Sequence, residues 1–180
     1  MTDEKIVSSE RIYDGRVVKM RVDTITKDGK ETFKREIIEH DGAVAMIPLH
    51  EDGTVTLVRQ YRSGSKQEML EIPAGGLEPG EPREECARRE LQEEIGMYPD
   101  ELIELGSFYV AASYTTERIT IYLARKLRPS TLQGDVDESI TMVKMPFAEA
   151  LNKVLTNEIE DSKTIIGMVW AARKLGIKID

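Results

Sequence analysis

The chain has 180 residues, enough for one domain whose hydrophobic core needs no disulfide or structural metal. Its net charge of −8 and pI near 5.0 argue against a nucleic-acid-binding or membrane-binding surface, because phosphate groups attract basic patches. Cys86 is the only cysteine, which excludes an internal disulfide, and no apolar run approaches the roughly 20 residues that span a bilayer. Residues 1–5 lack the apolar core of a signal peptide, so we expect a cytoplasmic protein.

Two segments near the start have the composition of strands, residues 17–26 and 32–40. The Asp28-Gly29 pair lies between them and favours the positive φ angles of a tight hairpin turn. We therefore expect an antiparallel β unit at the N-terminus.

Residues 43–49 and 55–61 repeat this arrangement around Asp52-Gly53 and predict a second hairpin. The strand-like residues 69–72 then lead into Pro73-Ala74-Gly75-Gly76, where proline removes a backbone donor and the glycines allow close approach of the backbone.

A helix is predicted over residues 82–95, because Pro82 suits a first helical turn and Gly96 a left-handed stop. The remaining predicted elements are strands at 103–111, 119–124 and 139–145 and helices at 147–155 and 162–175. In the last helix, the residues predicted to face the core are Ile165, Ile166, Val169 and Trp170. Strands and helices interleave without regular βαβ alternation, which favours a mixed-sheet α/β sandwich.

Acidic residues recur at fixed offsets around the 82–95 helix. The pattern is Gly75, five residues, Glu81, seven residues, then Arg89-Glu90-Leu91-Gln92-Glu93-Glu94-Ile95-Gly96-Met97. Glu90 and Glu94 differ by about 40° around the axis, so their carboxylates share one face and repel each other. A hard cation such as Mg²⁺ or Mn²⁺ would relieve that repulsion.

The neighbouring positions have separate predicted roles. Glu93 lies about 60° from Glu90, close enough for a second ion or a bridging water, and Arg89 is one turn before it. The apolar stripe that would anchor the helix to a sheet consists of Ala87, Leu91 and Ile95. Acidic helices are usually solvated surfaces, but solubility does not explain Glu81 or the preceding glycine-rich loop.

This spacing resembles the Nudix box of Nudix hydrolases. Segments that resemble the ADP-ribose pyrophosphatase group within that family are Arg35-Glu36-Ile37-Ile38-Glu39-His40, Gly42-Ala43-Val44-Ala45, Val58-Arg59-Gln60-Tyr61-Arg62 and Glu71-Ile72-Pro73-Ala74-Gly75. The resemblance implies a Nudix fold, an α/β/α sandwich with a mixed sheet and an N-terminal antiparallel β unit. It divides the chain into a β unit at 1–40, which serves dimerisation, and a catalytic domain at 41–180. In that group the β unit often exchanges between protomers, which implies a homodimer.

The resemblance also implies roles for individual residues. The Ala74 carbonyl, Glu90 and Glu94 would hold the metal. A later acidic loop would add a metal ligand or the base, for which Glu138 is preferred and Asp137 is the alternative. Glu93 is also expected to take part in catalysis, because of its position on the helix.

Three further residues are expected to contact the substrate. Arg35 and Arg62 resemble family residues on its phosphate or ribose side, and Glu117 matches a glutamate near the terminal ribose. Surface ion pairs, or a solvated loop for Glu117, are the alternative interpretations.

The implied reaction is metal-dependent hydrolysis of ADP-ribose to AMP and ribose 5-phosphate. Where that group usually has a Ser-Pro-Gly stretch, this chain has Ala111-Ala112-Ser113-Tyr114. Without Pro and Gly this stretch lacks a rigid turn, so other substrates stay possible, among them GDP-mannose, NADH and diadenosine polyphosphates. A hypothesis from another class is a non-catalytic Nudix domain that senses a nucleotide sugar and regulates a partner.

Overall fold

The computed structural model describes residues 4–27, 29–134 and 139–179, which fall into two compact units. One unit comprises the described part of Met1–Gly42 together with Phe108–Arg118; the other comprises Ala43–Ser107 and the described residues from Ile119 onward. The smaller unit thus contains a later segment of the chain in addition to the N-terminal residues. None of the described helices has the length and apolar character needed to cross a bilayer.

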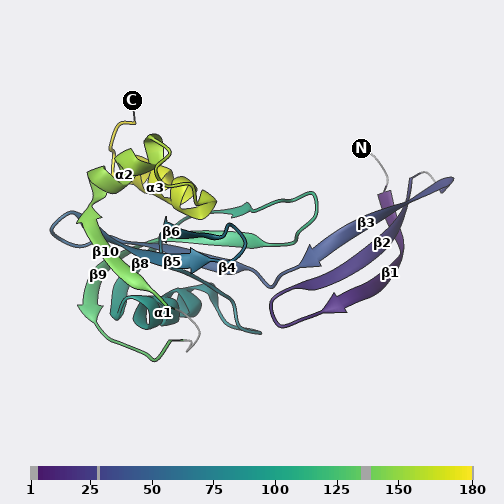
Figure 1. Cartoon of the computed structure of the whole chain (residues 1–180), viewed down its shortest axis with the longest axis horizontal. Coiled ribbons are helices and arrows are strands. Elements are labelled where there is room, and N and C mark those ends of the chain that lie inside the picture. The colour runs from purple at the N-terminus through teal and green to yellow at the C-terminus, as the bar shows by residue number, and fades with distance from the viewer. Residues whose placement is uncertain (1–3, 28, 135–138, 180) are drawn as a thin grey trace. The chain divides into compact units, whose positions relative to one another are not determined.

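The smaller unit contains a three-stranded antiparallel sheet in the order β1-β2-β3 (Figure 1). Its strands are β1 (Glu4–Asp14), β2 (Lys19–Lys27) and β3 (Glu31–Glu39). The predicted β2–β3 hairpin is confirmed: Thr26 pairs with Thr32, and Gly29 has a φ of 69°. Strand β1 was not predicted, because its side chains are exposed along the whole strand and its sequence therefore lacks apolar alternation.

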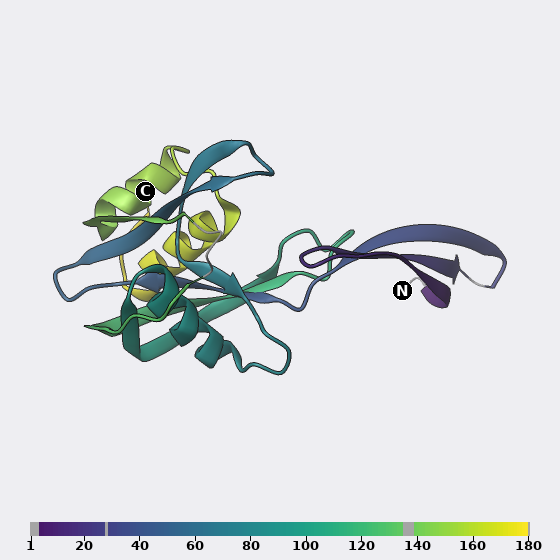
Figure 2. The same ribbon diagram turned by 60° about the horizontal axis from the view of Figure 1, so that its bottom comes forward.

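The larger unit is an α/β/α sandwich, as the resemblance implied. Its elements are β4 (Ala43–Pro48), β5 (Thr54–Arg62), β6 (Gln67–Glu71), β7 (Ala74–Gly76), α1 (Arg83–Glu94), β8 (Met97–Tyr109), β9 (Arg118–Pro129), β10 (Thr141–Pro146), α2 (Phe147–Leu155) and α3 (Ser162–Lys174). One sheet has the order β10-β5-β6 and the other β7-β4-β9-β8. In the second sheet β4 runs parallel to β9 and antiparallel to β7, so the sheet is mixed. Helix α1 lies on one side of the sheets and α2 and α3 on the other (Figures 1 and 2).

The predicted second hairpin is wrong, although its turn is present. Gly53 has a φ of 78° and its N–H donates to the His50 carbonyl, as in a tight turn. Beyond one bridge between Leu49 and Val55, however, β4 and β5 enter different sheets. Both strands are mostly buried, and separate sheets let each strand pack on both faces.

Alternate residues of the central strands pack in opposite directions. Val44 and Met46 of β4 join Tyr122 of β9 in the core cluster beneath α1. Ile47 and Ile121 lie instead against Gly167 of α3. The period-two alternation of a strand thus builds two cores around one sheet, and α1 packs on the face opposite α3.

Helix α3 presents a different face to the core from the one predicted. Its buried residues are Thr164, Gly167, Met168, Ala171 and Ala172, whereas Trp170 and its predicted companions are only half-buried. A Cβ at Gly167 would lie 3.0 Å from the Ile72 Cδ1 atom and 3.3 Å from the Ile47 Cδ1 atom. Apart from Met168, the contact face therefore consists of small residues, which let α3 approach the sheet closely.

Candidate metal and substrate site

Helix α1 carries the glutamates of the sequence pattern in a fixed orientation. It begins after Pro82 and is followed by Gly96, whose φ of 66° gives the predicted left-handed stop. The predicted anchor is confirmed, since Ala87 and Leu91 are fully buried and Ile95 is almost so. With that stripe held against the sheet, the glutamates on the other side of α1 lie toward the β7 loop.

A polar cavity of about 550 Å³ lies between α1 and the glycine-rich loop. The residues that line it are Ala74, Gly75, Gly76, Glu78, Arg89, Glu90, Glu93, Glu94, Gly134 and Ile140. The structure therefore brings together the three predicted metal ligands and Glu93 in one cavity.

Arg89 links the glutamates of this cavity to one another. Its Nε and Nη2 atoms donate to the two carboxylate oxygens of Glu81, each at 2.9 Å. Its Nη1 atom donates to Glu90 at 2.6 Å and to Glu93 at 3.0 Å, and Nη2 also donates to the Gly76 carbonyl. One guanidinium thus fixes the positions of three carboxylates and one backbone oxygen.

Gly75 and Ala74 bring the loop into direct contact with α1. A Cβ atom at Gly75 would overlap the carboxylate of Glu90. The Ala74 N–H donates to a carboxylate oxygen of Glu94 at 3.1 Å. Glycine at position 75 is therefore a steric requirement for the position of Glu90.

These groups suit a hard divalent cation. The space that glycine leaves is occupied by a carboxylate, and carboxylate and backbone oxygens meet in a cavity with a mainly polar lining. Within the described residues, no three His, Cys, Asp or Glu side chains converge as a complete metal cage. A site with few protein ligands fits Mg²⁺ or Mn²⁺, which keep waters and share oxygens of a phosphorylated substrate.

Glu81 makes the stability of this cluster depend on pH. The hydrogen bonds from Arg89 lower the pKa of Glu81 from 4.5 to about 2. Its contribution to folding is therefore complete above the unfolded-state pKa near 4.5 and is lost as the pH falls toward about 2. We expect Glu81→Gln to lower the free energy of unfolding at neutral pH by about 1–3 kcal/mol.

The difference in the free energy of unfolding between wild type and Glu81→Gln should become smaller on acidification from pH 5 to pH 3. Urea unfolding at each pH measures this difference. A difference of constant size across this range would contradict the assignment of the Glu81–Arg89 pair as the cause.

Arg62 forms a specific ion pair near this cavity. Its Nε and Nη2 atoms each donate to a different oxygen of the Glu71 carboxylate, both at 2.7 Å. The hydrogen bonds to Glu71 raise the pKa of Arg62, with a smaller contribution from the charge of Glu94. Arg62 thus lies within electrostatic range of a predicted metal ligand, while 39% of its side chain remains exposed.

Arg35 and Glu117 belong to the smaller unit. Arg35 is exposed and lines a cavity of about 590 Å³ together with Lys34, Ser113 and Tyr114. Glu117 is half-buried, and its backbone N–H donates to the Thr115 hydroxyl at 3.1 Å. Their contacts with a substrate remain predictions.

Glu138 and Asp137 lie outside the described residues, so the choice between them as base stays a prediction. Sequence reasoning did not identify Glu71, Lys163 or Thr164, which surround Arg62 and the start of the loop. Glu71 could have been found from the sequence, because it is a glutamate in the otherwise apolar run before Pro73. A charge in such a run is typically buried and needs a partner of opposite charge.

Comparisons with known proteins agree with this geometry. The NUDIX domain model matches residues 39–166. A methanol dehydrogenase activator of Bacillus methanolicus is 35% identical over 178 residues, covering 98% of this chain and 96% of that protein. An ADP-ribose pyrophosphatase of Bacillus subtilis is 34% identical over 176 residues, covering 96% and 94%. Another, of Mycobacterium tuberculosis, is 34% identical over 172 residues, covering 93% and 82%.

The fold has a close match among solved structures. The crystal structure of an ADP compounds hydrolase superposes with a TM-score of 0.86 at 24% identity, covering 96% of this chain and 94% of that one. A likeness at this identity concerns the fold alone, while the domain match and the full-length relatives concern the family. The glutamate pattern of α1, its loop and these matches together show that the chain belongs to the Nudix hydrolase family.

Proposed function

We propose that this protein is a metal-dependent pyrophosphohydrolase that cleaves ADP-ribose to AMP and ribose 5-phosphate. The observation that carries the proposal is the convergence of Glu90, Glu94 and the Ala74–Gly76 loop on one polar cavity. Identity of 34% to two ADP-ribose pyrophosphatases, along nearly the whole chain, supports the choice of substrate.

The proposed reaction adds one water to the diphosphate. The water oxygen bonds to one phosphorus while that phosphorus loses its bond to the bridging oxygen, which leaves with the other phosphate. A carboxylate takes the water proton; Glu138, Asp137 and Glu93 are the proposed acceptors. Bound Mg²⁺ or Mn²⁺ would neutralise the diphosphate and lower the pKa of the attacking water.

Other groups would bind and orient the substrate. Arg62 offers a cation on the same unit as the cavity. For Arg35 and Glu117 we retain the roles given by family resemblance, toward the phosphate or ribose side.

A panel of substrates tests the proposal directly. The purified protein is incubated with ADP-ribose, GDP-mannose, NADH, UDP-glucose or diadenosine tetraphosphate and either metal, and products are separated by chromatography. We expect the highest kcat/KM for ADP-ribose, with AMP and ribose 5-phosphate as products. Preference for a substrate without an ADP-ribose moiety would refute the substrate assignment.

A regulatory role is the second candidate, because one relative of nearly equal length is a methanol dehydrogenase activator. This role predicts that the protein raises the turnover of methanol dehydrogenase from Bacillus methanolicus in a coupled assay. Activation without hydrolysis of any compound in the panel would favour it over the hydrolase.

We further propose that the smaller unit joins two copies of the chain. Its described residues form a sheet without a covering helix, and many of its apolar side chains are exposed: Ile6, Val7, Ile12, Tyr13, Val17, Val18 and Phe33. A three-stranded sheet needs a packed face for stability, and a second copy offers matching apolar surface.

We expect sedimentation equilibrium to give twice the chain mass of 20.4 kDa. The double variant Ile6→Asp/Tyr13→Asp should shift the protein toward monomer, because it places charges in the apolar contact. Ser8→Asp, which adds a charge at an exposed polar position of the same strand, is the control. A wild-type monomer at micromolar concentration would refute the dimer.

A further inference from the structure

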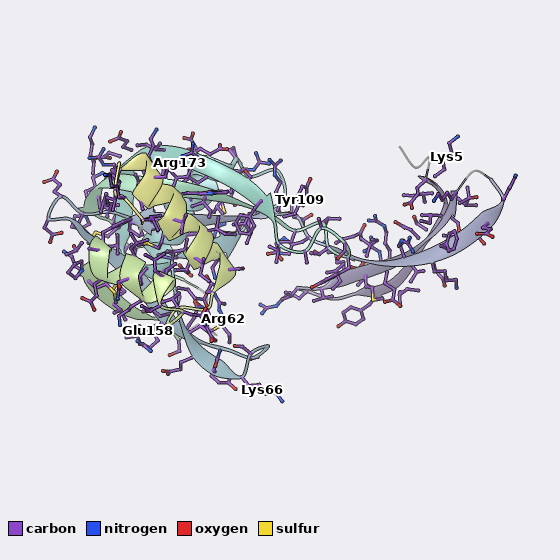
Figure 3. All side chains as sticks on the ribbon, turned by 90° about the horizontal axis from the view of Figure 1, so that it is seen from above. Lys5, Arg62, Lys66, Tyr109, Glu158 and Arg173 are labelled. Atoms are coloured by element: carbon purple, nitrogen blue, oxygen red, sulfur yellow. The ribbon has the colours of Figure 1, made fainter. Side chains whose placement is uncertain are left out.

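A cluster of four charged side chains joins β5, β6 and the start of α3. Glu71, at the end of β6, is 1% exposed and accepts both hydrogen bonds of the Arg62 fork. Lys163, the second residue of α3, donates to the same carboxylate. Lys163 also pairs with Asp161 at 3.0 Å. Figure 3 labels Arg62 near the start of α3 and Arg173 near its end.

The buried carboxylate of Glu71 requires positive charge around it. Burial alone raises the pKa of Glu71, but the hydrogen bonds and charges of Arg62 and Lys163 outweigh that effect and lower it. Glu71 is therefore ionised at neutral pH. With Arg62 as its sole partner, it would cancel the charge of that arginine; with Lys163 as a second partner, the three groups carry a net positive charge.

Asp161 also pairs with Lys163 and acts on Arg62 through its charge, but the start of α3 offsets part of that charge. Its Oδ2 atom accepts the Thr164 N–H at 2.9 Å and the Thr164 hydroxyl at 2.6 Å, as an N-cap does. The Thr164 hydroxyl in turn accepts the Ile72 N–H at 2.9 Å. These bonds fix the start of α3, and with it Lys163, against the residues adjoining Glu71.

The guanidinium of Arg62 has further N–H donors and enough exposed surface to bind a ligand. Glu71 engages two of the five N–H donors of a guanidinium, and the 39% exposure of the side chain leaves space for another acceptor. The fork geometry fixes the plane of the guanidinium, so the remaining donors have a defined direction.

We propose that Lys163 is a positioning residue for the substrate diphosphate, because it shares Glu71 with Arg62 and thereby keeps the charge of an oriented Arg62 available to an anionic ligand. The inference rests on the proposed function, since it takes the ligand to be a nucleoside diphosphate. Lys163 itself is mostly buried and acts through Glu71.

The test compares Lys163→Met, Lys163→Arg and the control Lys174→Met at the other end of α3. Turnover of ADP-ribose gives kcat and KM, and calorimetry gives the affinity for α,β-methylene-ADP with Mg²⁺, in which carbon replaces the bridging oxygen. We expect Lys163→Met to raise KM and weaken analogue binding about tenfold, with kcat within about twofold. Lys163→Arg should restore both within about threefold, and Lys174→Met should match wild type.

A double-mutant cycle separates charge compensation from a general structural role. In Glu71→Gln protein the carboxylate charge is gone, so adding Lys163→Met should change analogue affinity by less than about twofold. This pair lacks the buried Glu71 carboxylate, and Asp161 keeps its hydrogen bonds from Thr164, so the pair can be compared with Glu71→Gln even if Lys163→Met alone fails to fold. An equal tenfold loss in the Glu71→Gln background would overturn the inference, as would a fall in kcat at constant KM.

The binding measurement keeps this inference distinct from the hydrolase proposal. If wild type hydrolyses nothing but Lys163→Met still weakens analogue binding, the hydrolase proposal fails and the role of Lys163 stands. If wild type hydrolyses ADP-ribose and Lys163→Met binds the analogue normally, the inference fails and the proposed function stands.

Discussion

Replacing Glu94 by glutamine is expected to lower kcat for hydrolysis by at least about a hundredfold while the fold stays intact. Glutamine preserves the size of the side chain and an oxygen that can accept the Ala74 N–H. It removes the negative charge on the α1 face shared with Glu90, and with it most of the attraction for a divalent cation. The measurement is kcat at saturating Mg²⁺, together with Mn²⁺ affinity from electron paramagnetic resonance.

Glu85→Gln is the matched control for this variant. Glu85 belongs to the same helix, is exposed and pairs only weakly with Arg88 at 3.4 Å. Circular dichroism and thermal unfolding should be nearly the same for both variants. Retained hydrolysis and unchanged Mn²⁺ affinity in Glu94→Gln would refute the metal assignment.

The second large effect on hydrolysis is expected from adding one methyl group at position 75. Gly75→Ala places a Cβ where the Glu90 carboxylate lies, so that carboxylate must move and leave its hydrogen bond from Arg89. We expect hydrolysis to fall about a hundredfold, since displacement of a metal-binding group by about 1 Å can have that cost. Stability should change little, because the displaced group is the end of a flexible side chain.

Gly76→Ala separates this steric effect from any general sensitivity of the loop. A Cβ at Gly76 meets no atom within 4 Å, so the variant should retain activity within about threefold. Mn²⁺ affinity is measured for both variants. Equal activity of Gly75→Ala and Gly76→Ala would show that the position of Glu90 has no part in the reaction.

Local spacing was enough to predict the helix at the centre of this site. The angular separation of Glu90 and Glu94 follows from 3.6 residues per turn, and the buried stripe of Ala87, Leu91 and Ile95 follows from the same period. The hairpin at Gly29 and the helix stop at Gly96 were predictable because positive φ is a property of single residues. Each of these features depends on neighbours within a few positions along the chain.

Features that depend on partners distant in sequence were not predictable in this way. The turn at Gly53 is local, yet its flanking strands separate into two sheets because each buries both faces. Strand β1 forms by pairing with β2, and its exposed side chains show no alternation of apolar and polar residues in the sequence. In α3 the face with Gly167, Met168 and Ala171 is buried instead of Trp170, since close approach to the sheet at Gly167 leaves no room for a side chain there.

The charges around Arg62 show most clearly the difference between features set by neighbours in sequence and features set by distant partners. Glu71 was not predicted as a buried charge, although it lies in an otherwise apolar run before Pro73, and nothing near it in the sequence points to its partners. Lys163, 92 residues away, reaches that carboxylate only because α3 packs beside the end of β6. Helix and turn geometry is set by torsion angles within a few residues, whereas the choice of a counter-ion is made when the core closes and each buried charge must be satisfied.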